Sequence, residues 1–248
     1  MSLASFLTFY HLAGSLVLIA ALLMIVRFSL KRAQWSAGAR RIALLWSALV
    51  LIGWFAAAFA LAWSGAFTGP RDQLPTIQYG VLAPILVGLL AAAVIAPLRR
   101  LLASIPISAL IAVQFYRSLG VVFLILLALH RLPALFALPA GIGDVAVGLS
   151  APFVALAYAR NPERSAALAR RWNFFGLLDL AVALGTGVMT SPSPLQLFAF
   201  DAPNTLIGAF PLVLIPVFLV PLSILIHFTA LAKLRRAADP ATCAPHAA

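Results

Sequence analysis

Three ionisable side chains lie deep inside apolar stretches of this 248-residue sequence. Arg117 stands in VQFYRSLG, Asp144 in PAGIGDVAVG and Asp179 in GLLDLAVAL. Charged groups in such surroundings are costly, and they usually face one another or a water-filled cavity that binds an ion, a proton or a small solute. One arginine does not balance two aspartates, so the second carboxylate needs a proton or a further partner. The three residues therefore predict a buried Arg/Asp site.

Other polar side chains extend this predicted site. Gln114 precedes Arg117 by about one helical turn, and Ser223 and His227 lie one turn apart in a later apolar stretch. We expect His227 to pair with Asp179, because both positions fall in the same third of a membrane. Gln114, Ser223 and His227 are thus candidate ligands for a substrate or an ion.

The two aspartates are expected at different depths. Counting from the ends of the apolar stretches, Asp144 lies about 8 Å and Asp179 about 9 Å inside opposite membrane surfaces, at 1.5 Å per helical residue. His11 lies at about the depth of Asp144. Both aspartates occupy a small-residue pattern, G-x-x-D-x-A-V-x-L, which recurs at 141–149 and 176–184. Small residues let membrane helices pack closely, and the repeat is compatible with inverted symmetry.

The last apolar stretch, FPLVLIPVFLVPLSILIHF, contains three prolines. Each proline lacks a backbone N–H and clashes with the carbonyl four residues earlier, so it bends a helix. The helix is thus either permanently curved or able to bend as a hinge during function. The hinge candidates are Pro211, Pro216 and Pro221.

The residue types favour neither a cofactor nor a metal site. The lysines lie at Lys31 and Lys233, too near the ends of their stretches for a retinal Schiff base. His11 and His227 fall in opposite halves of the membrane, which argues against a bis-histidine haem. Asp179 and His227 lack an evident third metal ligand. No H-E-x-x-H, C-x-x-C, G-x-S-x-G or Walker pattern occurs.

The composition predicts that lipid surrounds most of the chain. Hydrophobic residues make up 64% of the sequence and charged residues 9%, and the mean hydropathy is +1.07. A water-facing surface needs many more charges. Seven stretches are long enough to cross the hydrocarbon core as helices. They predict an all-α integral membrane protein, a single seven-helix transmembrane bundle over residues 1–236 with a disordered tail at 237–248. The stretches are 5–26, 42–63, 77–96, 107–129, 139–159, 173–190 and 208–230.

The basic residues predict the orientation. Fourteen of the 17 lysines and arginines fall in alternate connections and the C-terminal tail, whereas two, Arg71 and Arg131, fall in the opposite connections. Positive residues stay in the cytoplasm, so the N-terminus is expected outside and the C-terminus inside. The basic residues that give the net charge of +11 are then expected to contact anionic lipids and not nucleic acid. Abundant arginine and alanine favour a bacterial source, hence a bacterial inner membrane.

Four sequence blocks carry a resemblance to a known group. QFYRSLGVVFLI, LPALFALPAGIGD, WNFFGLLDLAVA and FPLVLIPVFLVPLSILIHF resemble a family of uncharacterised small bacterial multi-pass membrane proteins. The resemblance covers mainly residues 110–235. It implies an inner-membrane location and no particular chemistry.

Three functions are compatible with these features. The first is a small transporter, or an ion- or proton-responsive membrane protein, that uses the Arg/Asp site. The second is a non-enzymatic assembly or binding factor whose buried charges only specify helix packing. The third is a membrane-embedded enzyme that uses Asp179 and His227, which requires the two side chains to lie within about one hydrogen bond or to share a metal.

Overall fold

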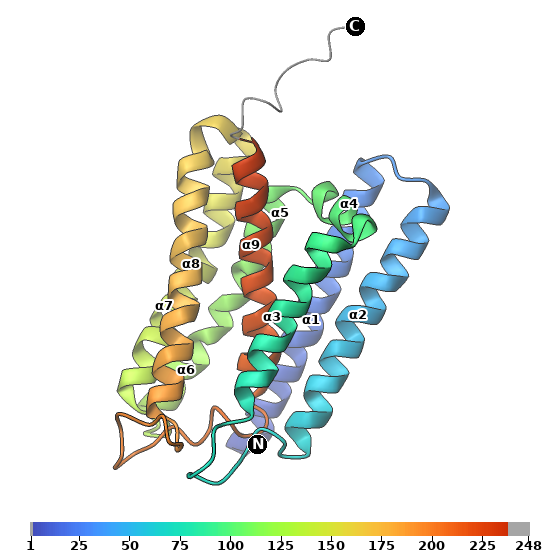
Figure 1. The fold of residues 1–248 in the computed structure, drawn as a ribbon. Helices are drawn as coiled ribbons and strands as arrows, with labels where there is room; N and C mark the ends of the chain where they lie inside the picture. The colour runs from blue at the N-terminus through green and yellow to red at the C-terminus, as the bar shows by residue number, and fades with distance from the viewer. Residues whose placement is uncertain (1, 238–248) are drawn as a thin grey trace, which may run out of the picture.

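A computed structural model describes residues 2–237, and over that range all regular structure is helical (Figure 1). Two spans contain an irregular helical segment, and the short helix α4 (Ala96–Ser104) lies between two spans. The predicted tail falls almost entirely outside the described residues. The spans long and apolar enough to cross a membrane are α1 (Leu3–Arg32), α2 (Ala37–Trp63), α3 (Ile77–Val94), α5–η1–α6 (Ile107–Ala128), α7 (Ala134–Arg160), α8 (Pro162–Thr190) and η2–α9 (Ile215–Ala237).

The number of long apolar helices equals the seven predicted, but several helices extend beyond their apolar stretches. The clearest case is α8, which begins at Pro162 instead of 173. Asn161 caps this start, because its side chain accepts a 3.0 Å hydrogen bond from the Arg164 N–H. Proline at the first helical position is also favourable there. Hydropathy therefore identifies the apolar part of a helix and misses its charged extension.

The predicted start of the last helix was wrong. Residues 208–213 form turns and a bend, and the π-helical segment begins at Ile215, directly after the helical residue 214. Pro211 therefore precedes the helix and cannot act as a hinge within it. Pro216 lies in the first turn, where its missing N–H costs little, and Pro221 follows directly after the first irregular turn.

Two irregular helical segments lie in the interior of the bundle. The fourth span passes from α5 (Ile107–Ala112) through the 3₁₀ segment η1 (Val113–Gly120) to α6 (Val121–Ala128). The last span begins with the π-helical segment η2 (Ile215–Leu219), followed by α9 (Val220–Ala237). Long 3₁₀ runs are uncommon, and π turns are frequent at functional sites. The predicted Arg/Asp site has its arginine inside η1.

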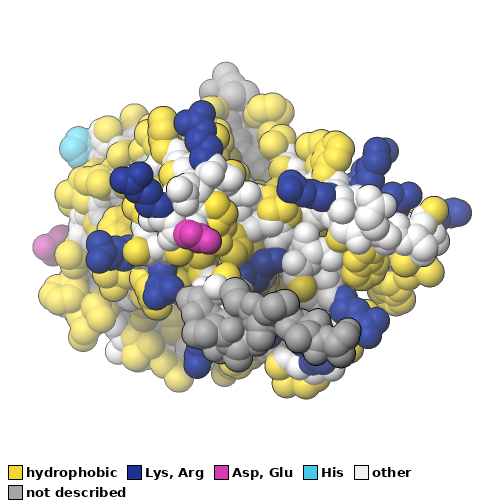
Figure 2. Space-filling view, turned by 90° about the horizontal axis from the view of Figure 1, so that it is seen from above, with side chains coloured by type: hydrophobic (Ala, Val, Ile, Leu, Met, Phe, Trp, Pro, Cys, Tyr) yellow, Lys and Arg dark blue, Asp and Glu magenta, His cyan; other side chains and the backbone are white. Residues whose placement is uncertain are grey.

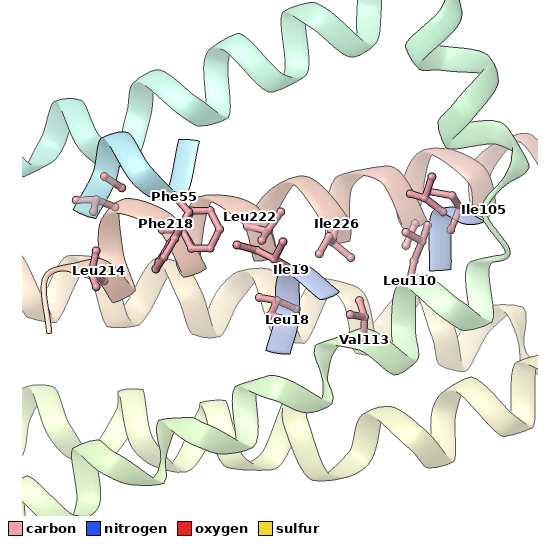
Figure 3. Packing of buried hydrophobic residues seen from close by; sticks show 14 of the residues in the cluster. Leu18, Ile19, Phe55, Ile105, Leu110, Val113, Leu214, Phe218, Leu222 and Ile226 are labelled. Atoms are coloured by element: carbon pink, nitrogen blue, oxygen red, sulfur yellow. The ribbon is translucent and has the colours of Figure 1, made fainter. Parts of the chain in front are cut away.

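The core is built around the last span, which lies between α8 and α3 in Figure 1. Phe218, Leu222 and Ile226 point from it toward buried residues of other helices, among them Leu18 of α1 (Figure 3). Phe218 is fully buried, and its ring lies 5.1 Å from that of Phe55 of α2 in an edge-on contact. These apolar contacts hold α1 and α2 to the span that carries two of the predicted site residues.

Charges are distributed unequally between the two ends of the bundle. The fourteen lysines and arginines of the alternate connections and the C-terminal segment belong to the end where α9 finishes, here called the basic end. Figure 2 looks onto this end and shows dark blue side chains spread over it with few acidic ones. The opposite, N-terminal end carries the start of α1 and the connections 64–76 and 191–214.

Candidate functional site

Arg117 of η1 is the centre of a buried polar cluster. The residue is 3% exposed, and its guanidinium contacts both predicted carboxylates. Nε donates to Oδ1 of Asp144 on α7 at 2.7 Å, and Nη2 donates to Oδ2 of Asp179 on α8. Nη1 donates to the Gly176 carbonyl at 3.2 Å. Three helices thus meet at one cation.

This geometry corrects the predicted depths. Asp144 and Asp179 do not lie in opposite halves of the bundle, since both reach the same guanidinium. Asp144 stands ten residues after the start of α7 and Asp179 eleven residues before the end of α8, so each lies about 15–17 Å from the N-terminal end of its helix pair. The error arose because the helices α7 and α8 are longer than their apolar stretches.

The predicted pairing of His227 with Asp179 was also wrong. Its Nε2 lies 3.3 Å from Nη1 of Arg117, and its Nδ1 lies 2.8 Å from Oδ1 of Asn173. Asn173 donates through Nδ2 to the Ala169 carbonyl at 2.8 Å, so its Oδ1 accepts from the Nδ1–H of His227. His227 is therefore a neutral acceptor toward Arg117.

Asn173 is a member of the cluster that sequence reasoning missed. It lies one turn before Gly176, which itself lies one turn before Asp179. The small and polar residues that share the face of Asp179 continue toward the N-terminus of α8 as far as Asn173. Asn173 was not recognised as a member, because the predicted helix began at residue 173.

Gln114 and Ser223 bind each other. Ser223 Oγ donates to Oε1 of Gln114 at 2.6 Å, and Nε2 of Gln114 donates to the Ser223 carbonyl at 3.2 Å. Both residues are fully buried. This reciprocal pair joins η1 to α9, and it lines neither of the two cavities described below.

Two glycines make room for the charged groups. A Cβ added to Gly143 of α7 would overlap the Asp179 carboxylate, and one added to Gly176 of α8 would lie 2.6 Å from Nε2 of His227. Real Cβ atoms are essentially never found under 3.0 Å from such groups. Glycine is therefore required at Gly143 for the close approach of α7 to α8, and at Gly176 for the close approach of α8 to His227 of α9.

A small chamber of about 40 Å³, with mostly apolar walls and a few polar side chains, adjoins the cluster on the side of α1. Arg117 and Asp144 line it together with His11, Ser15 and Tyr10. His11 is 4% exposed and Ser15 is fully buried, yet neither His11 Nε2 nor Ser15 Oγ has a hydrogen-bond partner among residues 2–237. Nδ1 of His11 is engaged with the Leu7 carbonyl at 2.7 Å, so Nδ1 carries the proton and Nε2 is a bare acceptor. The chamber is large enough for a water molecule, and the polar atoms of His11, Ser15 and Asp144 provide hydrogen-bond partners for one.

A larger cavity of about 440 Å³, here called the vestibule, adjoins the cluster from the N-terminal end. Its walls come from the connection before α3, the first turns of α3, the second half of α8 and the connection that follows α8. Asp144 is the one charged residue among its lining side chains, and Arg117 does not line it. Asp144 thus borders both cavities, whereas Asp179 borders neither.

This arrangement is suited to charge exchange more than to bond cleavage. The two carboxylates exceed the guanidinium by one formal negative charge, and one of them borders the vestibule. Within residues 2–237, no group of three or more His, Cys, Asp or Glu side chains could hold a metal ion. A proton, a small cation or a cationic solute is the species that such a cluster attracts.

The comparisons with known proteins identify one family. The family model described as Domain of unknown function (DUF8737) matches residues 74–235, well over half of the chain. The match contains all four sequence blocks on which the resemblance rested, together with Arg117, Asp144 and Asp179. Neither the curated proteins nor the solved structures gave a match.

Proposed function

The chain belongs to the family described as Domain of unknown function (DUF8737), and we propose that it is a proton-exchanging membrane transporter. In this proposal the helices cross a lipid bilayer seven times, and the Arg117–Asp144–Asp179 cluster is the site that takes up and releases protons. The observation that carries the proposal is the sharing of one buried guanidinium by two carboxylates, one of which borders a cavity.

The outer surface of the helices supports insertion in lipid. Large apolar side chains are exposed along several spans, including Phe9 (69%), Trp46 (62%), Leu86 (63%) and Phe153 (74%). Soluble monomers rarely expose apolar surface so continuously, whereas hydrocarbon solvates it without cost. The seven spans are also long enough for the hydrocarbon core.

The basic end supports an orientation with the C-terminus in the cytoplasm and the N-terminus outside. Lysines and arginines in short connections remain on the cytoplasmic side, where they contact anionic lipids (Figure 2). We place the protein in the inner membrane of a bacterium. The vestibule then opens toward the outside, because its walls belong to the N-terminal end of the bundle.

The cluster provides a chemical basis for exchange. A proton that reaches Asp144 through the vestibule neutralises its carboxylate and so weakens the ion pair between Asp144 and Nε of Arg117. Arg117 then keeps Asp179 and the Gly176 carbonyl as partners, and loss of the proton restores the first arrangement. Such competition of two anions for one cation is a two-state element that protonation can bias. The 3₁₀ segment that carries Arg117 is a backbone form suited to rearrangement.

The small chamber extends the proton route beyond Asp144. Water there would donate to Nε2 of His11 and to Ser15 Oγ, which are otherwise without partners, and would join them to the Asp144 carboxylate. His11 then accepts a proton on the side of Asp144 away from the vestibule. Gln114, Ser223 and His227 position Arg117 and the helices around it in this scheme.

The proposal is tested with purified protein in liposomes that contain a pH-sensitive dye. An imposed pH gradient is expected to dissipate at least fivefold faster with the wild type than with Asp144→Asn or Asp179→Asn. Asp201→Asn is the matched control, since Asp201 is an exposed loop residue of the N-terminal end. Equal rates in wild type, D144N and D179N, with all three proteins folded, would overturn the proposal.

A second function is favoured by a specific observation. The reciprocal Gln114–Ser223 pair and the fully engaged Arg117 resemble polar contacts that specify helix packing. If D144N and D179N lower thermal stability and leave proton flux unchanged, the protein is an assembly or binding factor.

A further inference from the structure

The vestibule has the features of a site for a molecule and not only of an entrance for protons. Its volume of about 440 Å³ falls within the usual range of about 300–1,000 Å³ for small-molecule pockets. Its walls are mostly apolar, with contributions from Phe67, Val81, Phe136 and Leu184. Pockets of this kind bind the apolar body of a ligand and orient it through a few polar groups.

The charge at the inner end of the vestibule is negative. Arg117 Nε binds Oδ1 of Asp144, and Oδ2 receives no hydrogen bond from the described residues. Because Arg117 does not line the vestibule, a ligand there meets the carboxylate and not the guanidinium. The cluster as a whole carries one excess negative charge, and apolar walls strengthen the attraction it exerts on a cation.

A second polar group lies farther along the same cavity. Asn204 is 1% exposed, and its side-chain Nδ2 has no hydrogen-bond partner in the part of the chain that the structure describes. Its Oδ1 accepts from the Ile207 N–H at 3.3 Å, which orients the amide so that the NH₂ group is the unengaged end. A buried donor without a partner costs free energy, and a ligand with an acceptor oxygen would satisfy it.

From these three features we propose that the vestibule binds an amphipathic organic cation, an amine whose ammonium group contacts Asp144 and whose apolar body lies along the walls. An acceptor atom on such a ligand would face Asn204. This assignment rests on the proposed function, because it names the substrate class for the same carboxylate. Displacement of the Asp144 proton by the ammonium group would couple the amine to proton exchange.

Binding can be tested separately from transport with the full chain in detergent. The probe is 4-phenylbutylamine, compared with the neutral 4-phenylbutanol and the anionic 4-phenylbutyrate, with Kd measured by isothermal titration calorimetry. We expect the amine to bind at least tenfold more tightly than either analogue. Equal affinity for the three probes, or tighter binding of the anion, would overturn the proposal.

Three variants locate the site. Asp144→Asn is expected to weaken amine binding at least tenfold. Asp179→Asn removes the excess negative charge from outside the vestibule but leaves the Asp144 carboxylate in place, so it should weaken binding less than D144N does. Ala183→Trp fills a wall of the vestibule while leaving every charged residue of the cluster in the sequence, and it should abolish binding even if D144N does not fold. Unchanged binding in A183W would overturn the proposal.

The remaining outcomes separate the two proposals. Amine binding without proton flux supports the site and contradicts the transporter. Proton flux without amine binding contradicts the site alone. A phospholipid that co-purifies with the protein and that the amine does not displace would assign the vestibule to lipid, and the amine site would be wrong.

Discussion

Tyr116 Oη donates a 2.9 Å hydrogen bond to the Leu219 carbonyl, and this bond joins the two irregular segments of the bundle. Tyr116 belongs to the 3₁₀ segment η1, and Leu219 is the last residue of the π-helical segment η2. Arg117 is the next residue of η1, so the position of the central cation depends on how η1 is held. The bond therefore helps to hold the backbone next to Arg117 in place.

Replacing Tyr116 with phenylalanine should lower the stability of the fold by about 1 kcal/mol, because one buried hydrogen bond is lost while the ring remains. The measurement is thermal unfolding of the purified protein in detergent. Tyr79→Phe is the matched control, since Tyr79 is 67% exposed. An equal effect of the two substitutions would contradict a supporting role for the Tyr116–Leu219 bond.

Removing Arg117 should be the most damaging single change in the cluster. Arg117→Leu leaves two carboxylates buried without their cation, and breaking a buried ion pair in this way costs about 3–5 kcal/mol. We expect a large fall in Tm or loss of folded protein. The same change at Arg131, an exposed loop residue, should have little effect.

Whether unpaired charge causes the instability of R117L can be tested by also neutralising Asp144 and Asp179. The triple variant R117L/D144N/D179N carries no buried charge at the cluster, so it should recover most of the stability lost in R117L. Equal instability of the single and the triple variant would mean that packing, and not unpaired charge, makes Arg117 necessary.

Much of the fold could be predicted from hydropathy, because lipid demands about 20 apolar residues for each crossing. The pattern identified seven spans and their interior charges. It could not locate Pro162 as the start of α8, since a helix outside the hydrocarbon follows its cap and not its hydropathy. It also could not place residues 208–213 outside a helix, because apolar residues form buried turns as readily as helices.

The three charged residues of the cluster were predicted as one buried group, but the depths of the two aspartates and the pairing of His227 were not predicted correctly. Arg117, Asp144 and Asp179 are conspicuous in an apolar sequence, whereas their common contact depends on the depth at which α7 and α8 pack. Asn204 and the open Nε2 of His11 gave no signal in the sequence, because a missing hydrogen-bond partner is a property of three-dimensional packing. Pairing partners were misassigned for the same reason.

Glycine should be required at the contact between α8 and the cluster. Gly176→Ala places a methyl group 2.5 Å from Cε1 of His227 and 3.3 Å from Nη1 of Arg117, so the neighbours must move. We expect a lower Tm and a slower proton flux. Gly185→Ala lies in the same helix with open space around it and should leave both unchanged, since alanine is the better helix former. Equal behaviour of G176A and G185A would contradict the close packing.

A substitution at His11, which lines the small chamber, can distinguish a structural role of this residue from a role in proton transfer. His11→Leu removes the unpartnered Nε2 acceptor and replaces it with an apolar side chain. Because the Leu7 carbonyl still has its helical partner, stability should stay equal or rise slightly.

Proton flux in liposomes should nevertheless fall at least threefold in H11L, because the chamber loses the group that accepts a proton from Asp144. His130→Asn is the control, since His130 is an exposed residue of the loop between α6 and α7 and asparagine tolerates its positive φ of 52°. A fall in Tm with unchanged flux would show that His11 only packs the first helix. Reduced flux at unchanged Tm would place His11 on the proton route.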